Sequence, residues 1–194
     1  MRGNVIGILR VRGFGEGVPE MVQQVLTQGR SRGARAWVLD LRGNGGGALP
    51  AVQRVAANFV ENRPVGIAVD RDGSRELLNA EGRPAIPRTP LVVLVDKETA
   101  SGAEILAAAL REYGIAPLVG ATTAGSVGIA NAQQLSDGSA VQLTIRRLVT
   151  PSGAQLDRVG VQPDVPVELT IADLERGEDP QLMRALELLV GTIQ

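Results

Sequence analysis

Two segments of the chain could take part in nucleophilic catalysis, one by supplying a nucleophile and the other by stabilising an oxyanion. Ser101 follows the apolar run Leu91–Val95 and a short polar loop, and it precedes a helical pattern. A serine at that place is held at the positive end of the helix dipole, which favours an alkoxide or an oxyanion. The structural alternative is a helix N-cap, in which Glu104, three residues later, completes a capping box.

The second segment is the glycine-rich run DLRGNGGGA at 40–48, between a predicted strand and a predicted helix. Bare glycine amides could stabilise an oxyanion. The run also fits the dinucleotide pattern G-x-G-x-x-A at Gly43, Gly45 and Ala48, but its strand end is charged and lacks the acidic residue expected about 20 residues later. A tight turn that merely needs glycine is a third interpretation. Spacing alone leaves all three open.

The composition excludes several kinds of catalytic residue and metal site. The 194 residues include no cysteine, no histidine and a single lysine, Lys97. A Ser-His-Asp triad, a cysteine nucleophile and a thiolate or imidazole metal site are therefore excluded, and we expect no metal and no cofactor. Any general base must be a carboxylate, Lys97, a tyrosine or water. A net charge of −1 gives no support for a nucleic-acid partner, and no apolar run approaches the roughly 20 residues of a membrane span.

Apolar patterning predicts the elements that position these segments. Strands alternate with amphipathic helices over the first two-thirds of the chain, which indicates an α/β fold with a mostly parallel sheet, in one domain over 1–194. Residues 70–83 are polar and rich in turn signals, and residues 120–128 form a Gly/Thr/Ser/Ala-rich loop. Strands flanking LSDGSA predict a hairpin. The expected strands are Val5–Val11, Ala36–Leu41, Val65–Val69 and Leu91–Val95, and the expected helices cover about 19–33, 48–60, 101–113 and 180–190.

Taken in order, several segments resemble those of the S41 family of serine peptidases, the tail-specific or C-terminal-processing peptidases. The resemblance covers about Val5 to Leu169. It rests on AWVLDLRGNGGGAL, DKETASGAEILAAALREYG, LVGATTAGSVG, LSDGSAVQLTIRRLVTPSG and GVQPDVPVEL. It implies a ClpP/crotonase-like spiral of βα units, a serine endopeptidase activity of the C-terminal-processing type and a polypeptide substrate.

The resemblance assigns roles residue by residue. Ser101 matches the catalytic serine, and the backbone amides of Gly47 and Gly102 match the oxyanion hole. Glu104 matches the family's glutamate three residues after the nucleophile. The family's general base is a lysine 25 residues after the serine, and that position holds Ser126 here.

Further positions depart from the family pattern. Ala130 replaces the family's helper glutamine, and Ala124 and Val127 replace two other residues of the same segment. Lys97 falls on a variable position and is predicted to be a solvated surface lysine rather than a base. Glu112 stands where the family often has an aspartate.

These departures leave three hypotheses for function. The first is a serine endopeptidase that uses Ser101, and the second is a catalytically impaired pseudopeptidase that binds peptides. The third is a different enzyme on a related fold that acts on thioesters. Because the resemblance occupies nearly the whole chain, we expect no PDZ domain within it. The family suggests a periplasmic or extracytoplasmic location if a leader was removed, and the sequence makes no prediction of oligomeric state.

Overall fold

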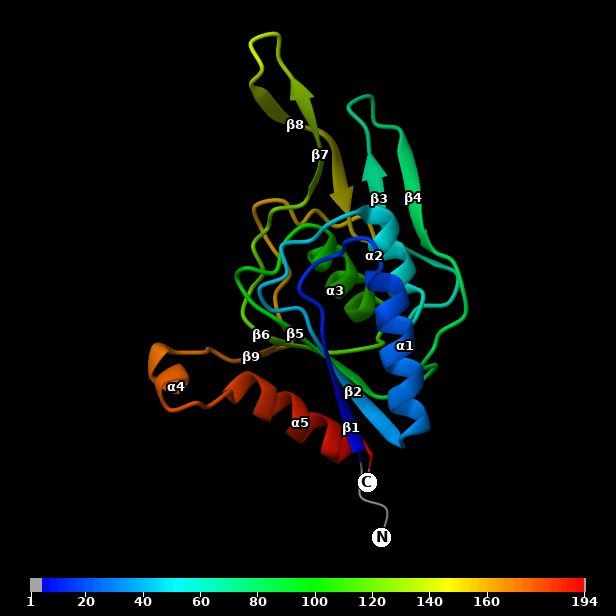
Figure 1. The fold of residues 1–194 in the computed structure, drawn as a ribbon, viewed down its shortest axis with the longest axis vertical. Helices are drawn as coiled ribbons and strands as arrows, with labels where there is room; N and C mark the ends of the chain where they lie inside the picture. Colours follow the sequence, from blue (N-terminus) through cyan, green and yellow to red (C-terminus); the bar gives the residue numbers. More distant parts are fainter. Residues whose placement is uncertain (1–4, 194) are drawn as a thin grey trace.

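A five-stranded parallel sheet forms the centre of the molecule, seen in a computed structural model that describes residues 5–193 (Figure 1). Its strand order is β1-β2-β5-β6-β9, and every neighbouring pair is parallel. This confirms the predicted α/β class with a largely parallel sheet. The strands are β1 (Val5–Arg10), β2 (Ala34–Asp40), β5 (Leu91–Val95), β6 (Leu118–Gly120) and β9 (Val165–Pro166).

Helices cover both faces of this sheet, which explains why its central strands are apolar throughout. Alternate residues of β2 point to opposite sides: Trp37 and Leu39 join the larger core cluster, whereas Ala36 and Val38 join a smaller one. The larger cluster is packed by the helices α1 (Val18–Ser31), α2 (Leu49–Ala56) and α3 (Gly102–Glu112). The smaller is closed by α5 (Pro180–Thr192), on the opposite side of the sheet in Figure 1.

A second, antiparallel sheet of order β4-β3-β8-β7 projects away from the parallel sheet as two hairpins (Figure 1). The predicted hairpin around LSDGSA is confirmed. The sequence missed one strand of this sheet, β4, because residues 75–80 lie in the stretch expected to be turn-rich. Its mixed sequence RELLNA does not alternate cleanly, yet Leu78 and Ala80 are buried. The strands are β3 (Arg63–Val69), β4 (Arg75–Ala80), β7 (Gly128–Gln134) and β8 (Ala140–Val149). The sequence also did not predict the short strands β6 and β9 of the parallel sheet.

Two further differences concern helices. The helix predicted over 48–60 ends at Ala56, and turns complete the segment. A short helix, α4 (Ile171–Glu175), was not predicted; Thr170 caps it by accepting from the Asp173 amide at 3.2 Å. None of the helices within residues 5–193 is long and apolar enough to cross a membrane.

Candidate active site

The loops after β2 and β5 meet because these two strands are parallel neighbours in register, with Asp40 opposite Leu94. Asn44, fully buried, joins the two loops. Its side-chain amide donates to the Val11 carbonyl at 2.9 Å, its side-chain oxygen accepts from the Gly46 amide at 2.9 Å, and its backbone carbonyl accepts from the Ala100 amide at 2.9 Å. The glycine-rich loop is thereby fixed against the segment that carries Ser101.

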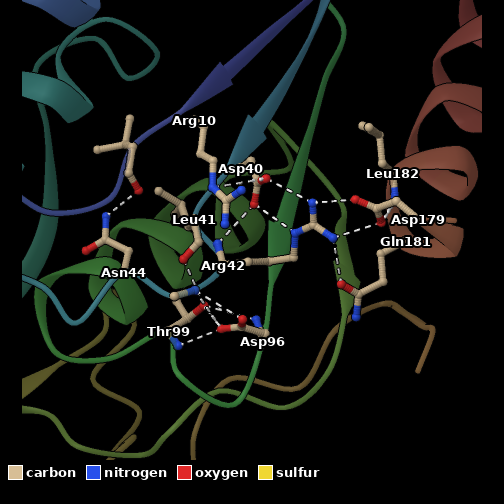
Figure 2. Close-up of polar contacts among 12 residues, drawn as sticks. Arg10, Asp40, Leu41, Arg42, Asn44, Asp96, Thr99, Asp179, Gln181 and Leu182 are labelled. Carbon is tan, nitrogen blue, oxygen red and sulfur yellow. Dashed lines mark hydrogen bonds and ion pairs between the residues drawn. The ribbon is translucent and has the colours of Figure 1, made fainter. Parts of the chain in front are cut away.

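A second cross-link joins the same loops (Figure 2). The buried Thr99 hydroxyl donates to the Leu41 carbonyl at 3.0 Å. The Asp96 carboxylate accepts from the Gly43 amide, with its two oxygens at 3.0 and 3.1 Å. Sequence reasoning gave neither residue a role, since each acts through a partner more than 50 positions away.

Ser101 has a strained backbone, with φ 55° and ψ −122° at the start of α3. A positive φ at a non-glycine residue costs about 1–3 kcal/mol and persists only where the surroundings impose it. The Ser101 amide donates to the Ser126 carbonyl at 3.0 Å, and Gly46 packs directly behind the residue. A Cβ on Gly46 would lie 2.7 Å from the Ser101 Cβ. Residues 96–100 separate the end of β5 from Ser101, so this is a strand–loop–helix arrangement and not the sharp elbow that presents the nucleophile of α/β hydrolases.

Glu104 is fully buried beneath Ser101 and its carboxylate accepts four hydrogen bonds. The donors are the Thr123 hydroxyl at 2.5 Å and the amides of Gly125 at 2.8 Å, Ser126 at 3.0 Å and Ser101 at 3.0 Å. These donors compensate the burial of a carboxylate, which is otherwise costly. Glu104 therefore joins α3, the start of the Ser101 turn and the 123–126 loop.

The backbone amides of Gly47 and Gly102 are the predicted oxyanion hole; Gly47 is exposed, Gly102 is buried, and neither lines the cavity beside Ser101. No hydrogen bond within residues 5–193 uses either amide as a donor. The two residues are neighbours, because a Cβ on Gly102 would lie 3.9 Å from the Gly47 carbonyl oxygen. Gly47 has φ 144° and lies so close to Phe14 that a Cβ would approach its carbonyl oxygen to 2.4 Å. Unengaged amides beside a helix N-terminus are suited to hold negative charge.

A cavity of about 660 Å³ opens in front of Ser101 and Ser126. Within the described part of the chain, no side chain hydrogen-bonds to the Ser101 hydroxyl. Lys97 is exposed, as predicted, and does not line this cavity. Asp157 is the one carboxylate among the lining residues, and the sequence gave no sign of it. The lining residues are Gly45, Ser101, Ser126, Val127, Gly128, Ala130, Gln142, Thr144, Arg147, Asp157 and Arg158.

Glu112 lies in a different place. Its carboxylate accepts from the Ser152 amide at 3.0 Å and from the Ser152 hydroxyl at 2.8 Å. It thus supports the turn at 150–153 and is not among the residues that line the Ser101 cavity. The described residues also include no group of three or more acidic side chains placed to hold a metal ion.

A buried ionic network anchors α5 to the glycine-rich loop (Figure 2). The Arg42 guanidinium makes paired hydrogen bonds with the carboxylates of Asp40 and Asp179, at 2.8 to 2.9 Å, and donates to Gln181 at 3.0 Å. Burial alone would lower the pKa of Arg42, but its bonds to the two carboxylates raise that pKa above its ordinary value. Asp179 also caps α5 by accepting from the Leu182 amide at 2.9 Å.

Comparison with known proteins places this geometry in a family. Residues 5–167 match peptidase family S41. The chain belongs to that family. It is 37% identical over 172 residues to the chloroplastic C-terminal processing peptidase of Tetradesmus obliquus, covering 88% of this chain and 37% of that protein. It is 36% identical over 194 residues to the carboxyl-terminal-processing protease of Synechocystis sp., covering 98% and 45%.

Solved structures show the same S41 core. The photosystem II D1 C-terminal processing protease superimposes with a TM-score of 0.78 at 37% identity, over 84% of this chain and 42% of that one. The tricorn protease shares the fold alone, with a TM-score of 0.62 at 21% identity, over 96% of this chain and 18% of that one. This S41 chain thus spans less than half the length of these relatives.

Proposed function

We propose that this S41 chain is a serine-type endopeptidase domain that cleaves polypeptides, with Ser101 as nucleophile. One observation carries the proposal: Ser101 is held at a strained helix start, beside the unengaged amides of Gly47 and Gly102. The Ser101 hydroxyl oxygen attacks the scissile carbonyl carbon, and the two amides receive the oxyanion. Collapse expels the nitrogen, which takes a proton from water or from Asp157 and leaves as an amine, and the remaining acyl-enzyme is hydrolysed by water to a carboxylic acid and free Ser101. The relatives' names suggest cleavage near a C-terminus.

Within residues 5–193, no side chain is placed to accept the proton of the Ser101 hydroxyl directly. Ser126 occupies the position of the family's lysine, and a hydroxyl is a poor base near neutral pH. An oxyanion hole with a nucleophile but no strong base retains part of the catalysis of a complete site. We therefore expect slow acylation, with proton transfer through water to the solvent or to Asp157, which lines the same cavity.

Labelling with a fluorophosphonate probe tests the proposal. We expect one adduct, on Ser101, located by mass spectrometry of peptide fragments, and its loss in Ser101→Ala. The matched control is Ser136→Ala, which removes an exposed hydroxyl from the turn of the β7–β8 hairpin and should keep the adduct. The proposal would be refuted if the chain is natively folded by circular dichroism but gives no adduct on Ser101.

A second candidate is a peptide-binding domain without turnover. The observation that favours it is the absence, within residues 5–193, of any side chain hydrogen-bonded to the Ser101 hydroxyl, together with Ala130 at the family's glutamine position. Peptide hydrolysis that disappears in Ser101→Ala would exclude this candidate. Saturable peptide binding with neither labelling nor hydrolysis would establish it over the first.

A further inference from the structure

A β-bulge places Arg147 on the face of β8 that borders the cavity in front of Ser101. In the β7–β8 pair, Gly128 lies opposite Arg147 and Ala130 lies opposite Thr144. Ile129 lies opposite Arg146, so Ile145 has no partner on β7 and is the extra residue of the bulge. Cross-strand partners share a face of the sheet. The bulge therefore puts Arg147 on the face that Thr144 presents to the cavity, which strict alternation would have given to Arg146.

The charge of Arg147 is not neutralised by the protein. No carboxylate in the described part of the chain lies within 4.0 Å of its guanidinium. Its neighbour Arg146, on the other side of the ladder, pairs with Asp70 at 2.9 Å and Glu76 at 2.7 Å. Because Arg147 is exposed and unpaired, its five N–H donors are available to a ligand.

Arg158 brings a second guanidinium to the same cavity. Its backbone has φ 60° and its amide donates to the Gly125 carbonyl at 2.6 Å, which attaches it to the loop that also carries Ser126. Its side chain is 93% exposed, and among the carboxylates of residues 5–193 only that of Asp157 lies within 4.0 Å of its guanidinium. The charged residues lining the cavity are Arg147, Arg158 and Asp157, so the cavity carries a net positive charge.

We propose that Arg147 and Arg158 form a subsite that binds a carboxylate of the peptide substrate, within the cavity that holds Ser101. Guanidinium groups bind carboxylates through paired hydrogen bonds and strongly enough to set a preference. The carboxylate comes from the free C-terminus of the peptide or from an aspartate or glutamate side chain. This inference rests on the proposed peptidase function, since it assigns a substrate preference to that site.

Peptide binding by the Ser101→Ala protein tests the subsite without turnover. The probes are fluorescein-labelled decapeptides of alanine and serine, read by fluorescence anisotropy. One has a free C-terminal carboxylate, one a C-terminal amide, and an amidated series carries a single aspartate at each position in turn. We expect at least one carboxylate-bearing peptide to bind about tenfold more tightly than the neutral peptide, about 1.4 kcal/mol. The arm that gains affinity identifies the source of the carboxylate.

Arginine variants then locate the effect. In Arg147→Gln and in Arg158→Gln we expect most of the tenfold preference to disappear, and Arg147→Lys should recover part of it because the charge returns. Arg35→Gln is the matched control, since Arg35 is exposed and lies at the start of β2, the end of the sheet away from Ser101. Circular dichroism and Tm measurements show whether each variant folds.

Equal affinity of all peptides for the Ser101→Ala protein, including no measurable binding, would overturn the subsite. So would a preference that persists in folded Arg147→Gln and Arg158→Gln. Fluorophosphonate labelling of the unmodified chain reports separately on the peptidase function. Labelling without a carboxylate preference rejects only the subsite, whereas a preference without labelling rejects only the peptidase activity and leaves a carboxylate-binding cleft.

Discussion

Replacing Glu104 by glutamine should destabilise the fold strongly, although the two side chains have nearly the same shape. A carboxylate accepts all four hydrogen bonds made to Glu104, whereas an amide has one accepting oxygen and one donating NH2 group. In one orientation the NH2 group faces the amides of Ser101 and Ser126. In the other it faces the Thr123 hydroxyl and the Gly125 amide. At least one buried amide then lacks an acceptor in either orientation.

The cost follows from these contacts. An unsatisfied buried amide costs about 1–3 kcal/mol. The remaining bonds change from charge-assisted to neutral, which removes roughly another 1 kcal/mol each. Because the Ser101 amide also donates to the Ser126 carbonyl, part of the loss is buffered. We expect Glu104→Gln to lose about 2–5 kcal/mol of unfolding free energy, a fall in Tm of roughly 5–15 °C for a chain of this size.

Urea unfolding followed by circular dichroism measures the loss. The matched control is Glu98→Gln, an exposed carboxylate in the loop before Ser101, which should change the unfolding free energy by less than about 0.5 kcal/mol. A loss below about 1 kcal/mol in Glu104→Gln, with the control unchanged, would contradict the view that Glu104 organises the turn.

Three further substitutions probe the site and its support. Ser126→Lys places an amine at the family's base position and should raise peptide hydrolysis about 10²- to 10⁴-fold; unchanged turnover in the folded variant would contradict a missing base as the limiting defect. Gly46→Ala should cost more than about 2 kcal/mol in urea unfolding and abolish labelling, because its Cβ would collide with Ser101. Burial raises the pKa of Asp179, but the hydrogen bonds from Arg42 outweigh it, so the folded-state pKa lies below the ordinary 3.8. The stabilisation by Asp179 is complete above the unfolded pKa and is lost as the pH falls through the folded one. The advantage of the unmodified chain over Asp179→Asn in urea unfolding should therefore shrink between pH 6 and pH 3.

The sequence predicted those parts of the fold that local patterning controls. Leu91–Val95 was placed with both ends correct, because five consecutive apolar residues between polar loops read as a buried strand. The strand Arg75–Ala80 was missed, because its assignment depends on pairing with β3 and packing against α2 rather than on its own residues. The helix Ile171–Glu175 was missed for a similar reason, since five residues are too few for a periodic pattern.

The candidate site likewise contains residues that the sequence indicated and residues that only the fold brings together. Ser101, Gly102 and Glu104 lie within one four-residue segment, and the structure brings Gly47 beside them. The residues that fix this arrangement are joined over long separations, as in the pairing of Arg42 with Asp179 across 137 positions. Such pairings leave no local signal. The same holds for Arg147, whose direction depends on a one-residue bulge in the ladder.

The backbone of Ser101 bears on the choice between a structural and a chemical role. An N-cap residue ordinarily has extended φ and ψ, as Thr170 does with φ −93° and ψ 161° at the start of α4. A cap alone therefore explains the pairing of Ser101 with Glu104 and leaves the φ of 55° unexplained. It also leaves unexplained why the amides of Gly47 and Gly102 have no acceptor within residues 5–193. A strained serine beside two amides without an acceptor supports the proposed acyl transfer. On that proposal the departure from the family lies in the proton acceptor, which Ser126→Lys tests directly.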